Sequence, residues 1–187
     1  MNILVGCEFS GIVRNAFTKA GHYAISCDYL DTELPGPHYT GNLKDIVGEG
    51  WDMLIVHPTC TRICVSGNSR WAGTPEREAD LDFVRWLLNL PIPRICLENP
   101  VGVISSQIRK PDQYIQPWMF GHGETKKTGL WLKNLPALKP TNIVPGREAR
   151  VHSLRDGHAQ YPTEKWRQRT RFWPGVAEAM ADQWGNL

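Results

Sequence analysis

Short apolar runs alternate with longer amphipathic stretches along the chain, a pattern typical of a sheet whose strands are joined by helices. The apolar runs predict strands at residues 3–5, 23–27, 38–41, 52–56, 94–97 and 129–132. Apolar spacings of three and four residues predict helices over residues 12–20, 75–90 and 176–184, the second of them capped by Thr74. Because strand and helix alternate, the pattern predicts an α/β fold with a doubly wound sheet.

The length of 187 residues and the composition predict one globular domain. Hydrophobic residues make up 41% of the chain, and no apolar run reaches the ~20 residues of a membrane span. The N-terminus enters a strand directly, so we expect no signal peptide. Five cysteines without regular spacing favour free thiols in a reducing compartment. We therefore expect a cytoplasmic protein that does not bind a membrane.

The net charge of +2 is too small to indicate a nucleic-acid partner by itself. Basic side chains nevertheless crowd the last quarter of the chain, at Arg147, Arg150, Arg155, Lys165, Arg167, Arg169 and Arg171. Such a cluster binds phosphates in some proteins and is a solvated basic face in others. The sequence leaves both interpretations open.

Two loops carry the candidate chemistry, His57-Pro58-Thr59-Cys60 and Leu97-Glu98-Asn99-Pro100. Each follows a predicted strand, and the loops at the carboxyl ends of strands line the ligand crevice of an open α/β sheet. We therefore expect a thiol and a carboxylate in one cleft, which suits covalent attack on a pyrimidine ring. Arg62 and Arg70 are close enough in sequence to lower the pKa of the Cys60 thiol. A buried structural cysteine and a turn-forming Glu-Asn-Pro remain the alternatives.

Metal binding is not expected from the spacing of the possible ligands. His57, Cys60 and Cys64 are spaced like ligands, but no fourth candidate lies near them in the sequence. A zinc nucleobase deaminase requires His-x-Glu upstream of Pro-Cys-x-x-Cys. Here the segment His122-Gly123-Glu124 follows these cysteines, and the Pro-Cys-x-x-Cys element is absent. We therefore predict no metal site.

A cofactor turn is suggested by Phe9-Ser10-Gly11, which follows the first predicted strand. Glycine at such a turn lets the backbone approach a bound nucleotide. Asp28 ends the second predicted strand, where dinucleotide-binding folds place the acidic residue that holds ribose hydroxyls. With a single glycine, the motif on its own is weak evidence.

Taken in order, these motifs resemble those of the DNA cytosine-5 methyltransferases, and the chain looks like a compact, phage-type relative of that family. Phe9-Ser10-Gly11 is similar to the Phe-x-Gly cofactor turn, and His57-Pro58-Thr59-Cys60 to the Pro-Pro-Cys nucleophile loop. Glu98-Asn99-Pro100 resembles Glu-Asn-Val, and Glu124-Thr125-Lys126-Lys127-Thr128 lies where the family has Gln-x-Arg-x-Arg. The segment from Pro174 to Met180 is similar to the last, cofactor-side helix.

The resemblance implies a Rossmann-like methyltransferase sheet with S-adenosylmethionine as cofactor. It places that cofactor against Phe9, Ser10, Gly11, Asp28, Asn42 and Pro58. It further implies that Cys60 adds to C6 of a cytosine in DNA while Glu98 holds N3 and the exocyclic amine. Asn99 and Lys126 complete the implied catalytic set. Phosphates of duplex or single-stranded DNA would be held by Lys127, Arg167, Arg169 and Arg171.

Departures from the family pattern affect the expected activity more than the expected fold. Val13 and Arg14 stand where the cofactor turn has its later glycines, and Thr59 replaces the second proline of the nucleophile loop. Lys126 and Thr128 replace two arginines. The fold is therefore predicted on firmer ground than turnover.

No target-recognition domain fits before the closing helix, because only residues 133–171, a Pro-rich and basic insertion, lie there. We therefore expect a single methyltransferase-like domain over residues 1–187, with little sequence discrimination or with a separate recognition subunit. Two other functions stay open. One is an inactive relative that binds nucleic acid or cofactor, and the other is an enzyme that modifies free pyrimidine nucleotides.

Overall fold

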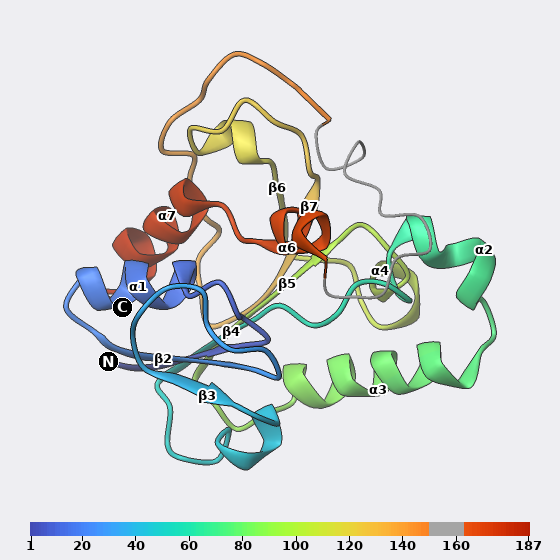
Figure 1. The fold of residues 1–187 in the computed structure, drawn as a ribbon, viewed down its shortest axis with the longest axis horizontal. Coiled ribbons are helices and arrows are strands. Elements are labelled where there is room, and N and C mark those ends of the chain that lie inside the picture. Colours follow the sequence, from blue (N-terminus) through green and yellow to red (C-terminus); the bar gives the residue numbers. More distant parts are fainter. Residues whose placement is uncertain (150–162) are drawn as a thin grey trace.

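A seven-stranded sheet forms the centre of the protein, in a computed structural model that describes residues 1–149 and 163–187 (Figure 1). The strands are β1 Asn2–Gly6, β2 Tyr23–Asp28, β3 His38–Thr40, β4 Met53–Val56, β5 Arg94–Pro100, β6 Gln113–Ile115 and β7 Thr128–Lys133, in the spatial order β3-β2-β1-β4-β5-β7-β6. Strands β1 to β5 pair in parallel, whereas β7 is antiparallel to both β5 and β6. The predicted α/β sheet is confirmed.

Helices cover both faces of this sheet. The α-helices are α1 Ile12–Lys19, α2 Asn68–Trp71, α3 Pro75–Leu88, α4 Ile104–Gln107, α6 Glu164–Thr170 and α7 Pro174–Trp184, and short 3₁₀ helices are η1 Leu43–Asp45, η2 Val65–Gly67 and η3 Pro117–Met119. Helices α1 and α7 lie side by side on one face, and α3 covers the other (Figure 1). Within residues 1–149 and 163–187, no helix has the length and apolar character needed to cross a membrane.

The core is divided by the sheet into two layers, and successive residues of a strand enter different layers. Ile3 and Val5 of β1 pack with α1 and α7, whereas Leu4 between them packs with α3. All three side chains are completely buried. A strand covered on both faces needs apolar residues at consecutive positions, which is why β1 and β4 are continuous apolar runs in the sequence.

Local signals predicted the boundaries of α3 well. The Thr74 hydroxyl accepts a hydrogen bond from the backbone N–H of Arg77, as expected of an N-cap, although the helix ends at Leu88 rather than at residue 90. Strand β6 and helix α6 were not expected. The three residues of β6 are too few to form a periodic pattern, and α6 is polar except for Trp166.

Candidate active site

The ends of β4 and β5 bring the two candidate loops into direct contact. These strands are parallel neighbours with Val56 opposite Leu97, and β4 ends there. Glu98 and Asn99, which the sequence placed in a loop after the strand, instead lie within β5, which continues to Pro100 and pairs with β7. His57 Nδ1 lies 3.0 Å from Glu98 Oε2, and Asn99 Nδ2 donates a hydrogen bond of 2.7 Å to the carbonyl of Pro58. The nucleophile loop and the Glu-Asn segment therefore form one cluster.

Glu98 lies at the centre of this cluster and is almost completely buried. Burial alone would raise the pKa of Glu98. The hydrogen bond and charge of His57, the charge of Lys126 and a hydrogen bond from Thr128 outweigh this effect, so the pKa lies below its ordinary value. Glu98 is therefore held as a carboxylate inside the protein.

Lys126 reaches the cluster from the segment that precedes β7. Its backbone N–H donates to the side-chain oxygen of Gln116, 3.0 Å away, and its ammonium lies 3.4 Å from the carbonyl oxygen of Arg169 in α6. The positive charge of Lys126 also acts on Cys60, where it partly opposes the hydrogen bond to Cys64 and the burial that together raise the pKa of that thiol. The structure thus assembles Cys60, Glu98 and Lys126 from three separate segments.

Cys60 and Cys64 share one turn, in which the backbone N–H of Cys64 donates to the carbonyl of Cys60 at 2.8 Å. The hydrogen bond to Cys64, together with burial, raises the pKa of the Cys60 thiol. The same hydrogen bond lowers the pKa of Cys64 to about 5, despite burial, with help from the Ser66 hydroxyl at 3.1 Å and from the N–H groups of Ser66 and Gly67. The interaction between the two thiols therefore favours ionisation of Cys64 over ionisation of Cys60.

Sequence reasoning placed the activating cations in the wrong segment. Arg62 forms an ion pair of 2.7 Å with Asp80, and its guanidinium and that of Arg70 lie over the ring of Trp71. The cation that acts on Cys60 is Lys126, which is distant in sequence. A spacing argument within the loop could not have found it.

Three of the expected cofactor residues, Asp28, Asn42 and Pro58, line one cavity of about 330 Å³ beside the cluster. Burial raises the pKa of Asp28, against the lowering effect of a hydrogen bond from the backbone N–H of Leu30. Helix α3 adds Asp80 and Phe83 to the wall. Sequence reasoning missed these two, although the first turns of a helix that follows a strand-end loop are natural neighbours of that crevice.

The expected turn Phe9-Ser10-Gly11 lies elsewhere, and the cavity wall does not include it. The Glu8 carboxylate occupies the N-terminus of α1, where it accepts hydrogen bonds from the backbone N–H of Val13 (2.7 Å) and of Arg14 (3.2 Å). Phe9 stacks on Trp166 of α6 with ring centroids 5.6 Å apart. The protein's own carboxylate thus fills the position where an anionic ligand would meet this helix.

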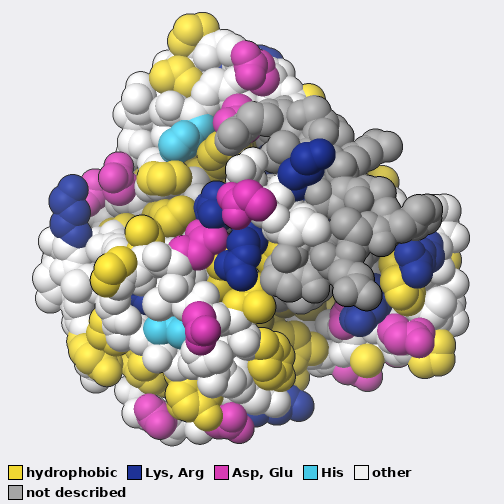
Figure 2. All heavy atoms as spheres, in the orientation of Figure 1, with side chains coloured by type: hydrophobic (Ala, Val, Ile, Leu, Met, Phe, Trp, Pro, Cys, Tyr) yellow, Lys and Arg dark blue, Asp and Glu magenta, His cyan; other side chains and the backbone are white. Residues whose placement is uncertain are grey.

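The basic residues assigned to phosphate binding have several different surroundings. Arg171 forms two hydrogen bonds to Glu33, of 2.6 and 2.8 Å, and Arg167 lies 3.5 Å from the same carboxylate. Lys127 is exposed, with its ammonium 4.4 Å from the ring centre of Tyr114. Arg150 and Arg155 are outside the described residues. On the face shown in Figure 2, the described Lys and Arg side chains are interspersed with Asp and Glu and form no continuous basic surface.

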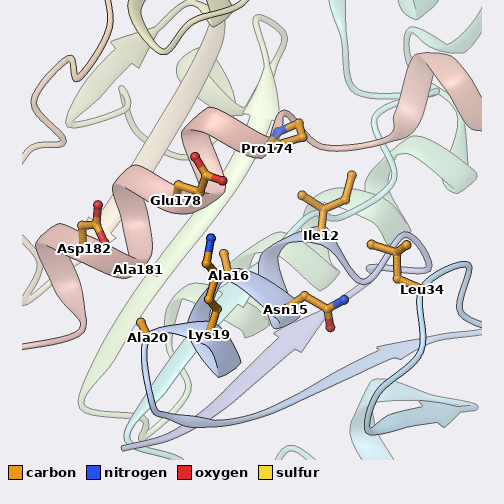
Figure 3. A pocket seen from close by; sticks show the side chains of 10 residues that line it. All are labelled: Ile12, Asn15, Ala16, Lys19, Ala20, Leu34, Pro174, Glu178, Ala181 and Asp182. Atoms are coloured by element: carbon orange, nitrogen blue, oxygen red, sulfur yellow. The ribbon is translucent and has the colours of Figure 1, made fainter.

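A larger hollow of about 530 Å³ lies away from this cluster, between α1 and α7 (Figure 3). Ile12, Ala16 and Pro174 contribute apolar surface to it, and Lys19 extends from α1 toward α7. The described residues around this hollow include none of the predicted site residues. Residues 1–149 and 163–187 also contain no group of three His, Cys, Asp or Glu side chains placed to hold a metal ion.

Comparison with known proteins gives a structural likeness alone, since the sequence matches no family model and no curated protein. The fold is similar to that of a putative DNA modification methyltransferase encoded within a prophage of E. coli, with a TM-score of 0.54, 15% identity, and coverage of 78% of this chain and 52% of the other. A further match is the S. pombe Dnmt2 methyltransferase, with a TM-score of 0.44, 17% identity, and coverage of 100% and 66%.

The prophage match defines the class of fold, an α/β methyltransferase sheet, as the sequence motifs implied. The present chain spans about half the length of that prophage protein. Activity, substrate and partners are therefore argued from the site itself.

Proposed function

We propose that this protein is an S-adenosylmethionine-dependent methyltransferase that acts on C5 of cytosine in DNA, with Cys60 as the nucleophile. The observation that carries the proposal is the contact between the Cys60 loop and the Glu98-Asn99 segment at one edge of the sheet. A polarisable thiol beside a buried, oriented carboxylate suits addition to C6 of a pyrimidine. We also propose that residues 1–187 act as a single methyltransferase-like domain, with the insertion 133–171 in the place of a recognition domain.

The cavity beside the cluster supports the choice of cofactor. Its volume of about 330 Å³ lies within the range of ~300–1,000 Å³ that small-molecule sites occupy. Asp28 offers an oxygen to ribose hydroxyls, Asn42 lies at the start of η1, and Phe83 gives an apolar wall. The cofactor, when bound, would supply an electrophilic methyl group. Because Phe9, Ser10 and Gly11 lie outside this wall, we assign them to the support of α1 and α6 rather than to direct cofactor contact.

The proton of Cys60 has a defined destination within the same turn. As the Cys60 sulfur adds to C6, its proton passes to the Cys64 thiolate, which is already its hydrogen-bond acceptor. Glu98 holds the exocyclic amine and the N3 edge of the base. Lys126 adds a positive charge that favours the anionic sulfur. Once C5 carries the methyl group, its proton would pass to water, the C5–H electrons would form the C5=C6 bond, and Cys60 would leave as a thiolate that regains its proton from Cys64.

Phosphate binding depends on which basic side chains are not already paired. Arg167 and Arg171 are already paired with Glu33, so we expect the exposed Lys127 to contribute more to phosphate binding than either arginine. A separate recognition subunit would supply the sequence discrimination that this chain lacks. A free pyrimidine nucleotide is the alternative substrate.

Trapping of the covalent adduct tests the proposal. The protein is incubated with S-adenosylmethionine and either an oligonucleotide containing 5-fluorocytosine or the free 5-fluorinated nucleotide, and intact mass is measured. We expect an adduct with the oligonucleotide that is absent in Cys60→Ser and forms at least about tenfold more slowly in Cys64→Ser. An adduct with the free nucleotide alone would replace DNA as the substrate. An unchanged adduct in Cys60→Ser, or no calorimetric binding of the cofactor or its demethylated product at millimolar concentration, would refute the proposal.

A further inference from the structure

The Pro-Pro-Cys motif matches Pro58, Thr59 and Cys60 and gives no role to His57, yet the His57 imidazole lies in direct contact with Glu98. The ring is held by the end of β4, where the backbone N–H of His57 donates to the carbonyl of Gly6 at 3.0 Å. Its side chain is 13% exposed, and its ring centre lies 4.7 Å from that of Phe172, in the segment between α6 and α7. The imidazole is therefore fixed between the sheet and the chain that follows α6.

The two nitrogens of this ring are in different situations. Nδ1 lies 3.0 Å from Glu98 Oε2, whereas Nε2 is buried and has no hydrogen-bond partner among the described residues. Asn99 Oδ1, in the segment that holds Glu98, is likewise buried without a described partner. A histidine that served only as packing would have both nitrogens satisfied or exposed to water. Two orphaned polar atoms in one cluster point instead to a polar ligand that completes it.

The charges around His57 come from three elements. Glu98 contributes a carboxylate from β5, Asp28 a second carboxylate from the end of β2, and Lys126 an ammonium from the segment before β7. Glu98 alone makes a direct hydrogen bond to the ring. A protonated His57 therefore cancels the charge of Glu98 at close range, and a neutral His57 leaves that charge balanced only by the more distant Lys126.

We propose that His57 is a positioning residue that acts through Glu98: its Nδ1–H holds Oε2 so that Oε1 can face the pyrimidine, and its positive charge offsets the carboxylate. This inference rests on the proposed function. When Cys60 adds to C6, negative charge develops on the N3 side of the ring. An uncompensated carboxylate at that edge would oppose the addition, so the neutral pair is the active form. Activity should then depend on both the hydrogen bond and the charge that His57 gives to Glu98.

The first measurement is the rate of adduct formation in wild type and in two variants. His57→Asn retains an N–H donor for Glu98 but carries no charge, and His57→Phe retains neither. We expect His57→Asn to react about tenfold more slowly than wild type. His57→Phe should react more slowly still, so that the retained donor of His57→Asn gives partial rescue. Equal rates in the two variants, or losses that parallel a loss of stability, would overturn the proposal.

The second measurement does not depend on turnover. The Nδ1–H resonance of His57 is observed by NMR in wild type and in Glu98→Gln, which keeps a side-chain oxygen as acceptor but removes the charge. We expect this resonance to move upfield in the variant, because a neutral amide is a weaker acceptor than a carboxylate. An unchanged resonance would overturn the pairing even in an active enzyme. A shifted resonance in a protein that forms no adduct would support the pairing while refuting the methyltransferase proposal.

Discussion

Two buried polar clusters lie at the same edge of the sheet, one around Arg14 and one around Glu98, and they differ in whether their polar atoms are satisfied. The Arg14 side chain is completely buried, and each of its nitrogens is hydrogen-bonded. Its acceptors are the side chains of Asn15, Ser26 and Thr32 and the carbonyls of Leu34, Pro35 and Pro37. Around Glu98, by contrast, His57 Nε2 and Asn99 Oδ1 have no described partner.

This difference separates a structural role from a functional one. A complete network lowers the free energy of the folded state and leaves nothing for a ligand to bind. A network with orphaned buried atoms is costly for stability, and such groups are retained where function uses them. The same contrast explains why the cofactor turn lacks a later glycine. Arg14 stands at that position and holds residues 32–37 against α1 by hydrogen bonds.

The largest effect is expected on stability, from Arg14→Met. Removal of the guanidinium leaves the carbonyl of Pro35 without its described donor and takes one donor each from the carbonyls of Leu34 and Pro37. Because several hydrogen bonds to one charged group are lost together, we expect the free energy of unfolding to fall by about 3–5 kcal/mol. Urea denaturation measures it, with Arg77→Met, another buried arginine that binds two carbonyls, as a matched control. A loss below about 1 kcal/mol would show that the Arg14 network is not the structural one.

Glu98→Gln should show the opposite behaviour. We expect turnover to fall by about 10²-fold or more, equivalent to about 2.7 kcal/mol, because the substituted amide places a donor where the base needs an acceptor. Because the surroundings of Glu98 favour its ionised form, loss of the charge should lower the free energy of unfolding, but by less than Arg14→Met does. Parallel denaturation and adduct-formation measurements decide this. If stability and activity both collapse, the contrast between the two clusters fails.

The cysteine pair gives a smaller effect with a defined pH dependence. The pKa of Cys64 is lowered to about 5, so its thiolate should be present above that pH and lost below it. Thiolate absorbance near 240 nm, measured between pH 4 and 10, should therefore rise with a midpoint near 5. In Cys64→Ser this step should vanish, and in Cys60→Ala it should move upward because the stabilising donor is removed. A single step above pH 8 in wild type would contradict the assignment.

The smallest effect concerns the attachment of α6 beside the site. Hydrogen bonds from Arg171, with the charges of Arg171 and Arg167, lower the pKa of Glu33 despite its partial burial. A lowered folded-state pKa gives stabilisation that is present above the unfolded value near 4.3 and is lost as the pH falls through the folded value. We expect a contribution of about 0.2–1 kcal/mol. Trp166 fluorescence between pH 2 and 6 should report it, and Glu33→Gln should remove the transition.

Much of the scaffold was predictable because its signals are local. Continuous apolar residues in β1 and β4 reflect strands buried on both faces, and the Thr74 cap begins α3 within a few residues of its own sequence. Since parallel strands end at one edge, the sequence also predicted that the loops of Cys60 and Glu98 would meet. For these features, the residues of one segment are enough to predict which positions are buried.

Only the tertiary structure decided which polar side chains contact each other within this scaffold. His57 binds Glu98 across 41 positions, and Arg171 binds Glu33 across 138, and both pairings depend on the order of strands and the path of the chain after β7. The sequence did not predict that the Glu8 carboxylate binds the N-terminus of α1. This contact depends on the conformation of the turn, in which Gly11 has a φ of 74° and the carboxylate reaches the first N–H groups of the helix. Local sequence specifies which residues are buried and where strands end, whereas the partners of buried polar atoms are set by segments far apart in the chain.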